Sequence, residues 1–138
     1  MVEVNFSVRD DLQVDARLGP EWPVFDDALG DSISSLPPRG ATGNGPSTYW
    51  IDQAEKGAVE AHRSGDIRPF LWGNITVLRV IDNMVVAKYD YDDDEPGEAV
   101  PLNDFLEVLT EWRRRVQASA QAATKPLPET YRRNPHQS

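Results

Sequence analysis

The densest group of ionisable side chains is the run Asp90-Tyr91-Asp92-Asp93-Asp94-Glu95, which places five carboxylates in six residues. Carboxylates this close repel one another, so the run is more stable when a cation or a basic protein neutralises it. A calcium loop starting at Asp90 fails on spacing, because Glu95 stands where the turn glycine belongs and Pro101 where the bidentate glutamate belongs. The run therefore predicts either a solvated loop or an acidic surface that binds Lys and Arg of a partner protein.

Aromatic side chains and further carboxylates accompany this run. Trp and Tyr often anchor protein interfaces, and Trp72 stands beside a predicted turn while Tyr91 lies within the acidic run. The helix predicted over residues 23–36 carries more carboxylates off its apolar stripe. The candidate partner-binding residues are Trp72, Asp90, Tyr91, Asp92, Asp93, Asp94, Glu95 and Glu98, with Asp26, Asp27 and Asp31 as a second possible patch.

Catalytic and cofactor chemistry has few candidates in this chain. It has no cysteine, which excludes disulfides, thiolate zinc sites, iron–sulfur clusters and cysteine nucleophiles. The two histidines, His62 and His136, have no associated nucleophile. We expect no enzyme activity, no catalytic residues, no metal and no cofactor. One alternative stays open, a small-ligand pocket between sheet and helix where Trp50, His62 and Tyr89 could meet.

Charge is distributed unevenly along the 138 residues. Residues 1–112 hold 22 acidic and 8 basic side chains, a net charge of −14, whereas residues 113–138 have a net charge of +5. An acidic body repels phosphate backbones and anionic membrane surfaces, so direct nucleic-acid or membrane binding is not expected and a basic protein partner is. No apolar run is long enough for a membrane span and the N-terminal residues lack the features of a signal peptide, so we expect a cytoplasmic protein.

Alternating apolar and polar residues over 2–8 and 12–18 predict two strands of a hairpin. A three-residue loop, Arg9-Asp10-Asp11, would pair Phe6 with Val14 and keep the apolar side chains on one face. A second hairpin is predicted over residues 70–91.

This second hairpin has a favourable two-residue turn at Asp82-Asn83, which would pair Val80 with Val85 on its core face. The other face is mixed, with Arg79 beside Val86. It is either covered by another element or offered to a partner.

Helical spacing predicts three helices. The first covers residues 23–36, the second follows the glycine- and proline-rich loop 37–47 and ends at Gly65, and the third begins at a cap on Asn103. With a short extended piece before the third helix, the order is β-β-α-α-β-β-(β)-α. We expect an α+β domain over residues 1–118, in which about three helices cover mainly one face of an antiparallel sheet. Residues 119–138 are expected to form a disordered basic tail.

The C-terminal part of the predicted domain resembles a known class of proteins. The segments Val85-Val86-Ala87-Lys88-Tyr89-Asp90-Tyr91 and Val100-Pro101-Leu102-Asn103-Asp104-Phe105-Leu106, followed by Trp112, look like bacterial immunity proteins of polymorphic-toxin and contact-dependent-inhibition systems. The resemblance covers roughly residues 70–117. It implies a cytosolic protein that binds a cognate toxin domain, often a basic nuclease, and blocks its active site or substrate groove. A monomer is expected, and a dimeric secretion chaperone that holds a client protein is the alternative in the same class.

Overall fold

The computed structural model describes residues 2–41, 45–92 and 96–124, which form an α+β domain. Proline in the first turn begins α1, and a left-handed Gly65 ends α2, as the sequence predicts. The elements are β1 (Asn5–Val8), β2 (Val14–Arg17), α1 (Pro23–Asp31), α2 (Tyr49–Ser64), β3 (Leu71–Trp72), β4 (Thr76–Ile81), β5 (Met84–Tyr89), β6 (Glu98–Pro101) and α3 (Leu102–Thr124).

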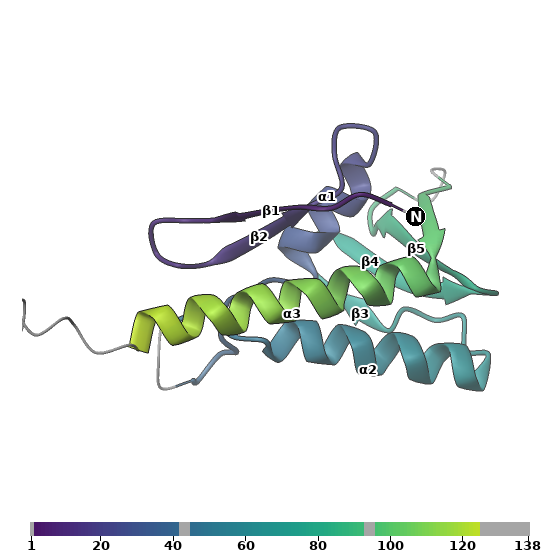
Figure 1. Cartoon of the computed structure of the whole chain (residues 1–138). Coiled ribbons are helices and arrows are strands. Elements are labelled where there is room, and N and C mark those ends of the chain that lie inside the picture. Colours follow the sequence, from purple (N-terminus) through teal and green to yellow (C-terminus); the bar gives the residue numbers. More distant parts are fainter. Residues whose placement is uncertain (1, 42–44, 93–95, 125–138) are drawn as a thin grey trace, which may run out of the picture.

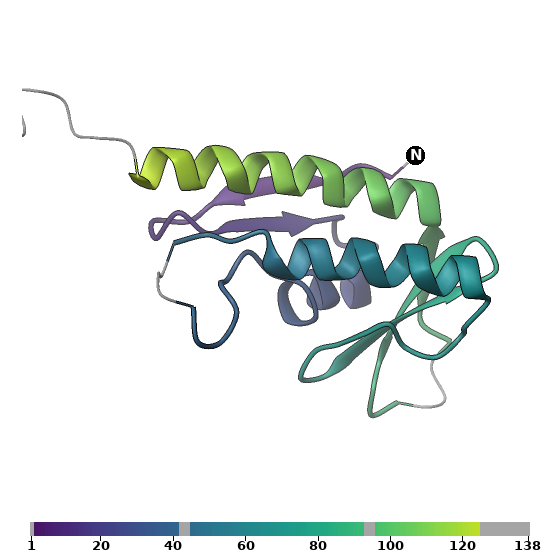
Figure 2. The same ribbon diagram turned by 90° about the horizontal axis from the view of Figure 1, so that it is seen from below.

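The strands form two antiparallel sheets, β1-β2 and β3-β4-β5-β6. Figure 1 shows α2 and α3 running antiparallel beside each other, with the β1-β2 ribbon on the far side of α3. Seen from below in Figure 2, α1 lies between that ribbon and the four-stranded sheet. The expected fold class and element order are confirmed, with two sheets in place of one.

The core lies where the three helices meet both sheets. Trp112, Phe25 and Phe105 are its largest fully buried side chains. The Trp112 indole Nε1 donates a hydrogen bond to the Val14 carbonyl oxygen over 2.8 Å, which fastens α3 to the first hairpin. A buried indole N–H is costly without an acceptor, so this bond helps to set the register of α3 against β2.

The first hairpin differs from the sequence prediction in register. Phe6 pairs with Ala16, and Val8 pairs with Val14, so the connection is longer than the expected Arg9-Asp10-Asp11 loop. Leu12 adopts a positive φ of 70°, which an alternating pattern does not indicate. A shift by two residues leaves every side chain on its original face, so polarity alone could not distinguish the two registers.

The second hairpin has the predicted register, with Val80 opposite Val85 and Asp82-Asn83 at the turn. Its core face packs into the main cluster through Leu78, Val85 and Ala87. On the opposite face Val77 is fully buried, whereas Ile81 is exposed. That mixed face is therefore part covered and part open.

Three of the predicted boundaries are wrong. Helix α3 begins at Leu102, so Asn103 lies within the helix and is not its cap. Helix α1 ends at Asp31, five residues before the expected end, and the chain then passes through Ser32 and Ser35, both buried. Helix α3 continues to Thr124, beyond the domain end expected at 118, and buried Ser119 donates a hydrogen bond to the Leu12 carbonyl oxygen over 2.6 Å. The rest of the expected tail lies outside the described residues. No described helix is both long and apolar enough to cross a membrane.

Candidate partner-binding site

The carboxylate of Asp31 at the end of α1 organises the turn between β3 and β4. It accepts hydrogen bonds from the backbone N–H groups of Asn74 (2.8 Å), Ile75 (2.9 Å) and Thr76 (3.0 Å), and from the Thr76 hydroxyl (2.8 Å). Partial burial alone would raise the pKa of Asp31, but these donors outweigh it and the pKa lies below its ordinary value. A Cβ atom at Gly73 would collide with this carboxylate, so glycine is required there.

Two further carboxylates also hold α1 in place. Asp26 accepts hydrogen bonds from the backbone N–H groups of Leu18 (2.6 Å) and Gly19 (3.3 Å), where the chain leaves β2. Glu98 on β6 accepts the backbone N–H of Phe25 in the first turn of α1 over 2.9 Å. A helix N-terminus has unpaired N–H groups and a partial positive charge, so a carboxylate stabilises it.

Asp27 links α1 to the end of β5, because its carboxylate accepts a hydrogen bond from the Tyr89 hydroxyl. This bond, with partial burial and nearby negative charge, raises the pKa of Tyr89 to about 12. The four carboxylates Asp26, Asp27, Asp31 and Glu98 thus bind groups of the protein itself. Their use as partner contacts stays a prediction, and the geometry favours a structural role for them.

The remaining predicted acidic residues gather where β5 ends. We use the name acidic sheet end for Asp90, Tyr91 and Asp92; the predicted Asp93, Asp94 and Glu95 lie outside the described residues. Asp90 is exposed, and its backbone N–H donates to the Ile75 carbonyl oxygen over 2.8 Å. The Tyr91 ring is 72% exposed and stacks on Tyr89, with ring centroids 5.4 Å apart.

A groove of about 420 Å³ lies beside this sheet end. Its apolar walls are Trp50 from the first turn of α2, Trp72 from β3, and Leu36 and Pro37 from the connection after α1. The Trp72 side chain is 59% exposed, and Tyr49 packs edge-on against Trp50 at a centroid distance of 4.9 Å. We call this the aromatic groove; its lining residues are Gly30, Asp31, Ser32, Ser34, Leu36, Pro37, Arg39, Trp50, Trp72 and Asn74.

The polar lining of the aromatic groove contains both hydrogen-bond donors and acceptors, because Asn74, Ser32 and Ser34 carry both kinds of group. Within the part of the chain that the structure describes, neither the Trp50 nor the Trp72 indole N–H has a hydrogen-bond acceptor. Arg39 adds an exposed guanidinium, which can only donate. The Asp31 carboxylate at the groove is already occupied by four donors. The groove therefore offers a ligand apolar aromatic surface together with hydrogen-bonding groups of both kinds.

The aromatic groove and the acidic sheet end share one turn of the chain. Asn74 lines the groove, and the next residue, Ile75, accepts the N–H of Asp90. The structure thus brings predicted Trp72, Asp90 and Tyr91 to one end of the sheet. Sequence analysis missed Leu36, Pro37 and Arg39, because no pattern indicates that a proline-rich loop folds back towards a tryptophan on β3.

The residues proposed for a ligand pocket do not meet. Trp50 lines the aromatic groove and Tyr89 is bonded to Asp27, whereas His62 Nε2 lies 2.8 Å from Asn83 Oδ1 beside a different cavity, of about 340 Å³. The three side chains therefore do not line one described cavity, and a small-ligand function stays a prediction.

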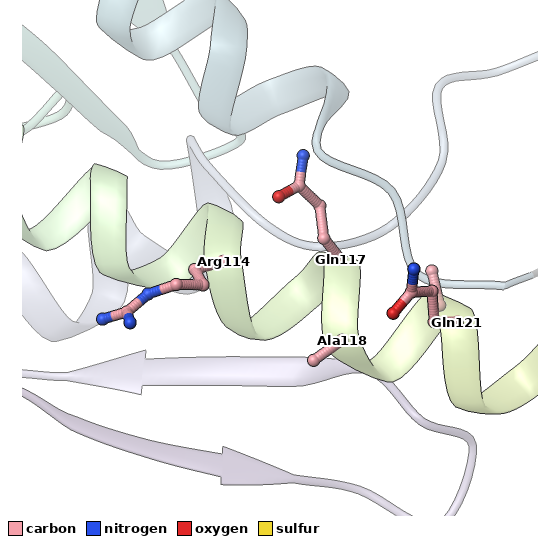
Figure 3. A pocket seen from close by; sticks show the side chains of 5 residues that line it. Arg114, Gln117, Ala118 and Gln121 are labelled. Atoms are coloured by element: carbon pink, nitrogen blue, oxygen red, sulfur yellow. The ribbon is translucent and has the colours of Figure 1, made fainter.

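The largest of the described cavities, about 640 Å³, lies along the C-terminal half of α3. Figure 3 shows Arg114, Gln117, Ala118 and Gln121 projecting from that helix in different directions, so their side chains do not converge on one point. Among the described residues no group of three or more His, Cys, Asp or Glu side chains could hold a metal ion. Comparison of the chain with protein-family models, with curated proteins and with solved structures finds no match.

Proposed function

We propose that this protein is an immunity-type inhibitor that binds and neutralises a basic toxin domain in the cytoplasm. The observation that carries the proposal is the continuity of the acidic sheet end with the aromatic groove through the turn at Asn74 and Ile75. A strong protein interface combines charged groups with a concave aromatic surface, and this end of the sheet has both.

Each part of this surface has a separate role in binding. The acidic sheet end attracts a basic partner over distance and raises the association rate, an effect that salt weakens. The aromatic groove then anchors the complex, because Trp and Tyr lose little conformational entropy when they bury a large area. Four exposed large apolar side chains lie in or beside the groove, an accumulation that is costly unless a partner covers it. They are Leu36, Tyr49, Trp72 and Ile75.

Affinity capture from the host lysate with three bait proteins tests the proposal. Wild-type bait should retain one basic protein in a 1:1 complex, and retention should weaken at high salt. The double variant Trp72→Ala/Tyr91→Ala should lose it, since both side chains are exposed and their removal leaves the core intact. Ile67→Ala is the matched control, because Ile67 is 61% exposed but lines the cavity beside His62.

Capture alone does not establish inhibition, so the retained protein must then be expressed in a sensitive cell. It should stop growth when produced alone, and co-production of the wild-type chain should restore growth while the Trp72→Ala/Tyr91→Ala variant does not. A retained protein that is harmless on its own would contradict the immunity proposal. A dimeric chain that prevents aggregation of an unfolded client would instead support the secretion-chaperone alternative.

A further inference from the structure

Strand β1 has an open edge. Its partner β2 lies on one side of it, and α1 and α3 both pack on β2. Figure 1 shows β1 as the strand of this ribbon that lies farther from α3. Natural proteins usually block such edges with proline, charge or short length. Strand β6 ends in Pro101 and β3 has two residues, whereas β1 has neither proline nor charge over Asn5–Val8.

The direction of the backbone hydrogen bonds shows which residues face this edge. The Arg9 N–H donates to the Gln13 carbonyl oxygen over 2.8 Å at the end of the hairpin. Hydrogen-bonded pairs alternate with non-hydrogen-bonded pairs along an antiparallel ladder. Ser7 is therefore hydrogen-bonded to β2, whereas Phe6 and Val8 direct their N–H and C=O groups away from it.

The far side of β2 has the same alternation. Val14 lies opposite Val8 and directs its backbone groups away from β1. Its N–H donates to the Ser35 hydroxyl over 2.9 Å, and its C=O accepts the Trp112 indole N–H. The outward groups of Phe6 and Val8, by contrast, have no hydrogen-bond partner among the described residues. A further strand can therefore bind at β1 in exchange for water.

The sequence of β1 is complementary to itself in one antiparallel register. In this register Phe6 lies opposite Phe6 of a second copy, and Val4 lies opposite Val8 of that copy. These alternate residues carry the outward backbone groups, so they would be hydrogen-bonded across the new pair. Val8, which is 59% exposed, would then be covered by Val4 of the second copy.

Charge selects the same register. It places Glu3 opposite Arg9 of the second copy, on the polar face of the strand, and opposite charges across a strand pair attract. Arg9 contacts Asp15 of its own chain over 3.1 Å, and half of its side chain stays exposed. A slip of two residues in one direction places Asp10 against Val4, and in the other direction it separates Glu3 from Arg9.

We propose that two copies of this chain pair through β1 in this register and form a four-stranded sheet, β2-β1-β1-β2, across a dimer. The sequence predicts a monomer, because polarity does not indicate which strand of a ribbon has an open edge. The joined edge is short, so we expect a dissociation constant on the order of 10 µM. The inference goes beyond the proposed function and does not rest on it, because β1 and the acidic sheet end belong to different sheets.

Sedimentation velocity of the full chain from about 1 to about 300 µM tests the pairing. The wild-type chain should be monomeric at the lowest concentration and mainly dimeric at the highest. Val8→Pro removes an outward N–H without breaking a bond to β2, so it should raise the dissociation constant about tenfold or more. Val8→Thr is the matched control, because it keeps the N–H and the branched side chain and should dimerise like wild type.

Two results of this experiment would overturn the proposal. One is a wild-type chain that stays monomeric over the whole range, and the other is a Val8→Pro variant that dimerises as well as wild type.

A cross-linking test identifies the register, because the chain has no cysteine of its own. Asn5 and Ser7, both exposed, lie opposite each other across the dimer as a non-hydrogen-bonded pair. The Cα atoms of such a pair are about 4.5 Å apart, a separation that a disulfide can bridge. Oxidised glutathione should therefore cross-link a mixture of Asn5→Cys and Ser7→Cys chains, but neither variant alone.

Each single variant reports on a slipped register. Asn5 lies opposite its own counterpart after a slip of two residues in one direction, and Ser7 does so after a slip in the other direction. Cross-linking of either variant alone, without cross-linking in the mixture, would overturn the proposed register.

The same variants decide what occupies the edge. A chain that is monomeric alone, but whose Val8→Pro variant fails to capture a partner that Val8→Thr retains, would assign the edge to a strand of that partner and overturn pairing with a second copy. A monomer would leave the proposed function standing, because that proposal depends on the acidic sheet end and the aromatic groove. A dimer does not by itself favour the secretion chaperone, which requires protection of an unfolded client.

Discussion

Two groups of carboxylates that look alike in the sequence have opposite surroundings in the structure. Asp31 accepts backbone N–H groups from a turn more than 40 residues away, and Asp26 accepts those of Leu18 and Gly19. Asp90 instead lies exposed at the acidic sheet end, and among the described residues only its backbone is hydrogen-bonded. The difference is caused by the backbone N–H donors. The turns and strand ends around α1 contain N–H groups that have no backbone acceptor, and these groups bind the carboxylates of α1. An acidic side chain is thus a candidate for partner binding only where no backbone donor of the protein already binds it.

Removal of the Asp31 carboxylate gives the largest expected effect. Asp31→Ala leaves the N–H groups of Asn74, Ile75 and Thr76 without their acceptor, and hydrogen bonds to a charged group are worth about 1.5–3 kcal/mol each but are not additive. We expect a loss of about 3 kcal/mol in unfolding free energy, measured by urea denaturation.

Asp90→Ala is the matched control for this prediction. It removes the same charge from an exposed side chain, so the unfolding free energy should stay within about 0.5 kcal/mol of wild type. Equal losses in the two variants would mean that net charge, and not the hydrogen bonds of Asp31, controls stability.

A smaller loss is expected at Asp26. Asp26→Ala removes the acceptor for Leu18 and Gly19, one short bond of 2.6 Å and one long bond of 3.3 Å, in a partly buried place. The expected loss is about 1–2 kcal/mol. Asp26→Asn retains one acceptor oxygen and should recover part of it in the same urea titration; no recovery would assign the effect to the charge at the start of α1.

The sequence pattern predicts best what depends on polarity along one element. The Asp82-Asn83 turn and the register of β4 with β5 are confirmed, because a two-residue turn leaves only one alignment that puts Val80 and Val85 on the core face. In the first hairpin several loop lengths give the same faces, and the choice depends on distant contacts. Buried Gln13, for example, accepts a hydrogen bond from the Ser35 hydroxyl over 2.7 Å.

The candidate site was predicted only in part, again because the sequence pattern shows polarity along one element and not contacts between distant elements. Trp72 and Tyr91 are recognisable from residue type and from the turns near them, and both are exposed. The aromatic groove depends on how the chain after α1 returns to β3, where Asp31 holds the turn at Asn74. No local sequence pattern indicates a contact between residues so far apart in the chain.

The smallest effect is expected at Tyr89, which joins the two regions compared above. Its hydroxyl donates to Asp27 of α1, and its ring stacks on Tyr91 of the acidic sheet end. The pKa of Tyr89 is raised from 10.0 to about 12, so the folded state retains this proton at a pH where the unfolded chain has lost it. The bond therefore contributes its full stability below pH 10 and loses it as the pH rises towards 12.

Tyr89→Phe keeps the stacked ring but removes the proton, so its unfolding free energy should fall less steeply than that of wild type over this range. Tyr91→Phe keeps both stacked rings and the bond to Asp27, so its slope should stay much closer to wild type, because Tyr91 is only a minor cause of the raised pKa of Tyr89. If the Tyr89→Phe slope also matches, the link from Asp27 does not reach the sheet end, and the structural and exposed carboxylates are energetically separate.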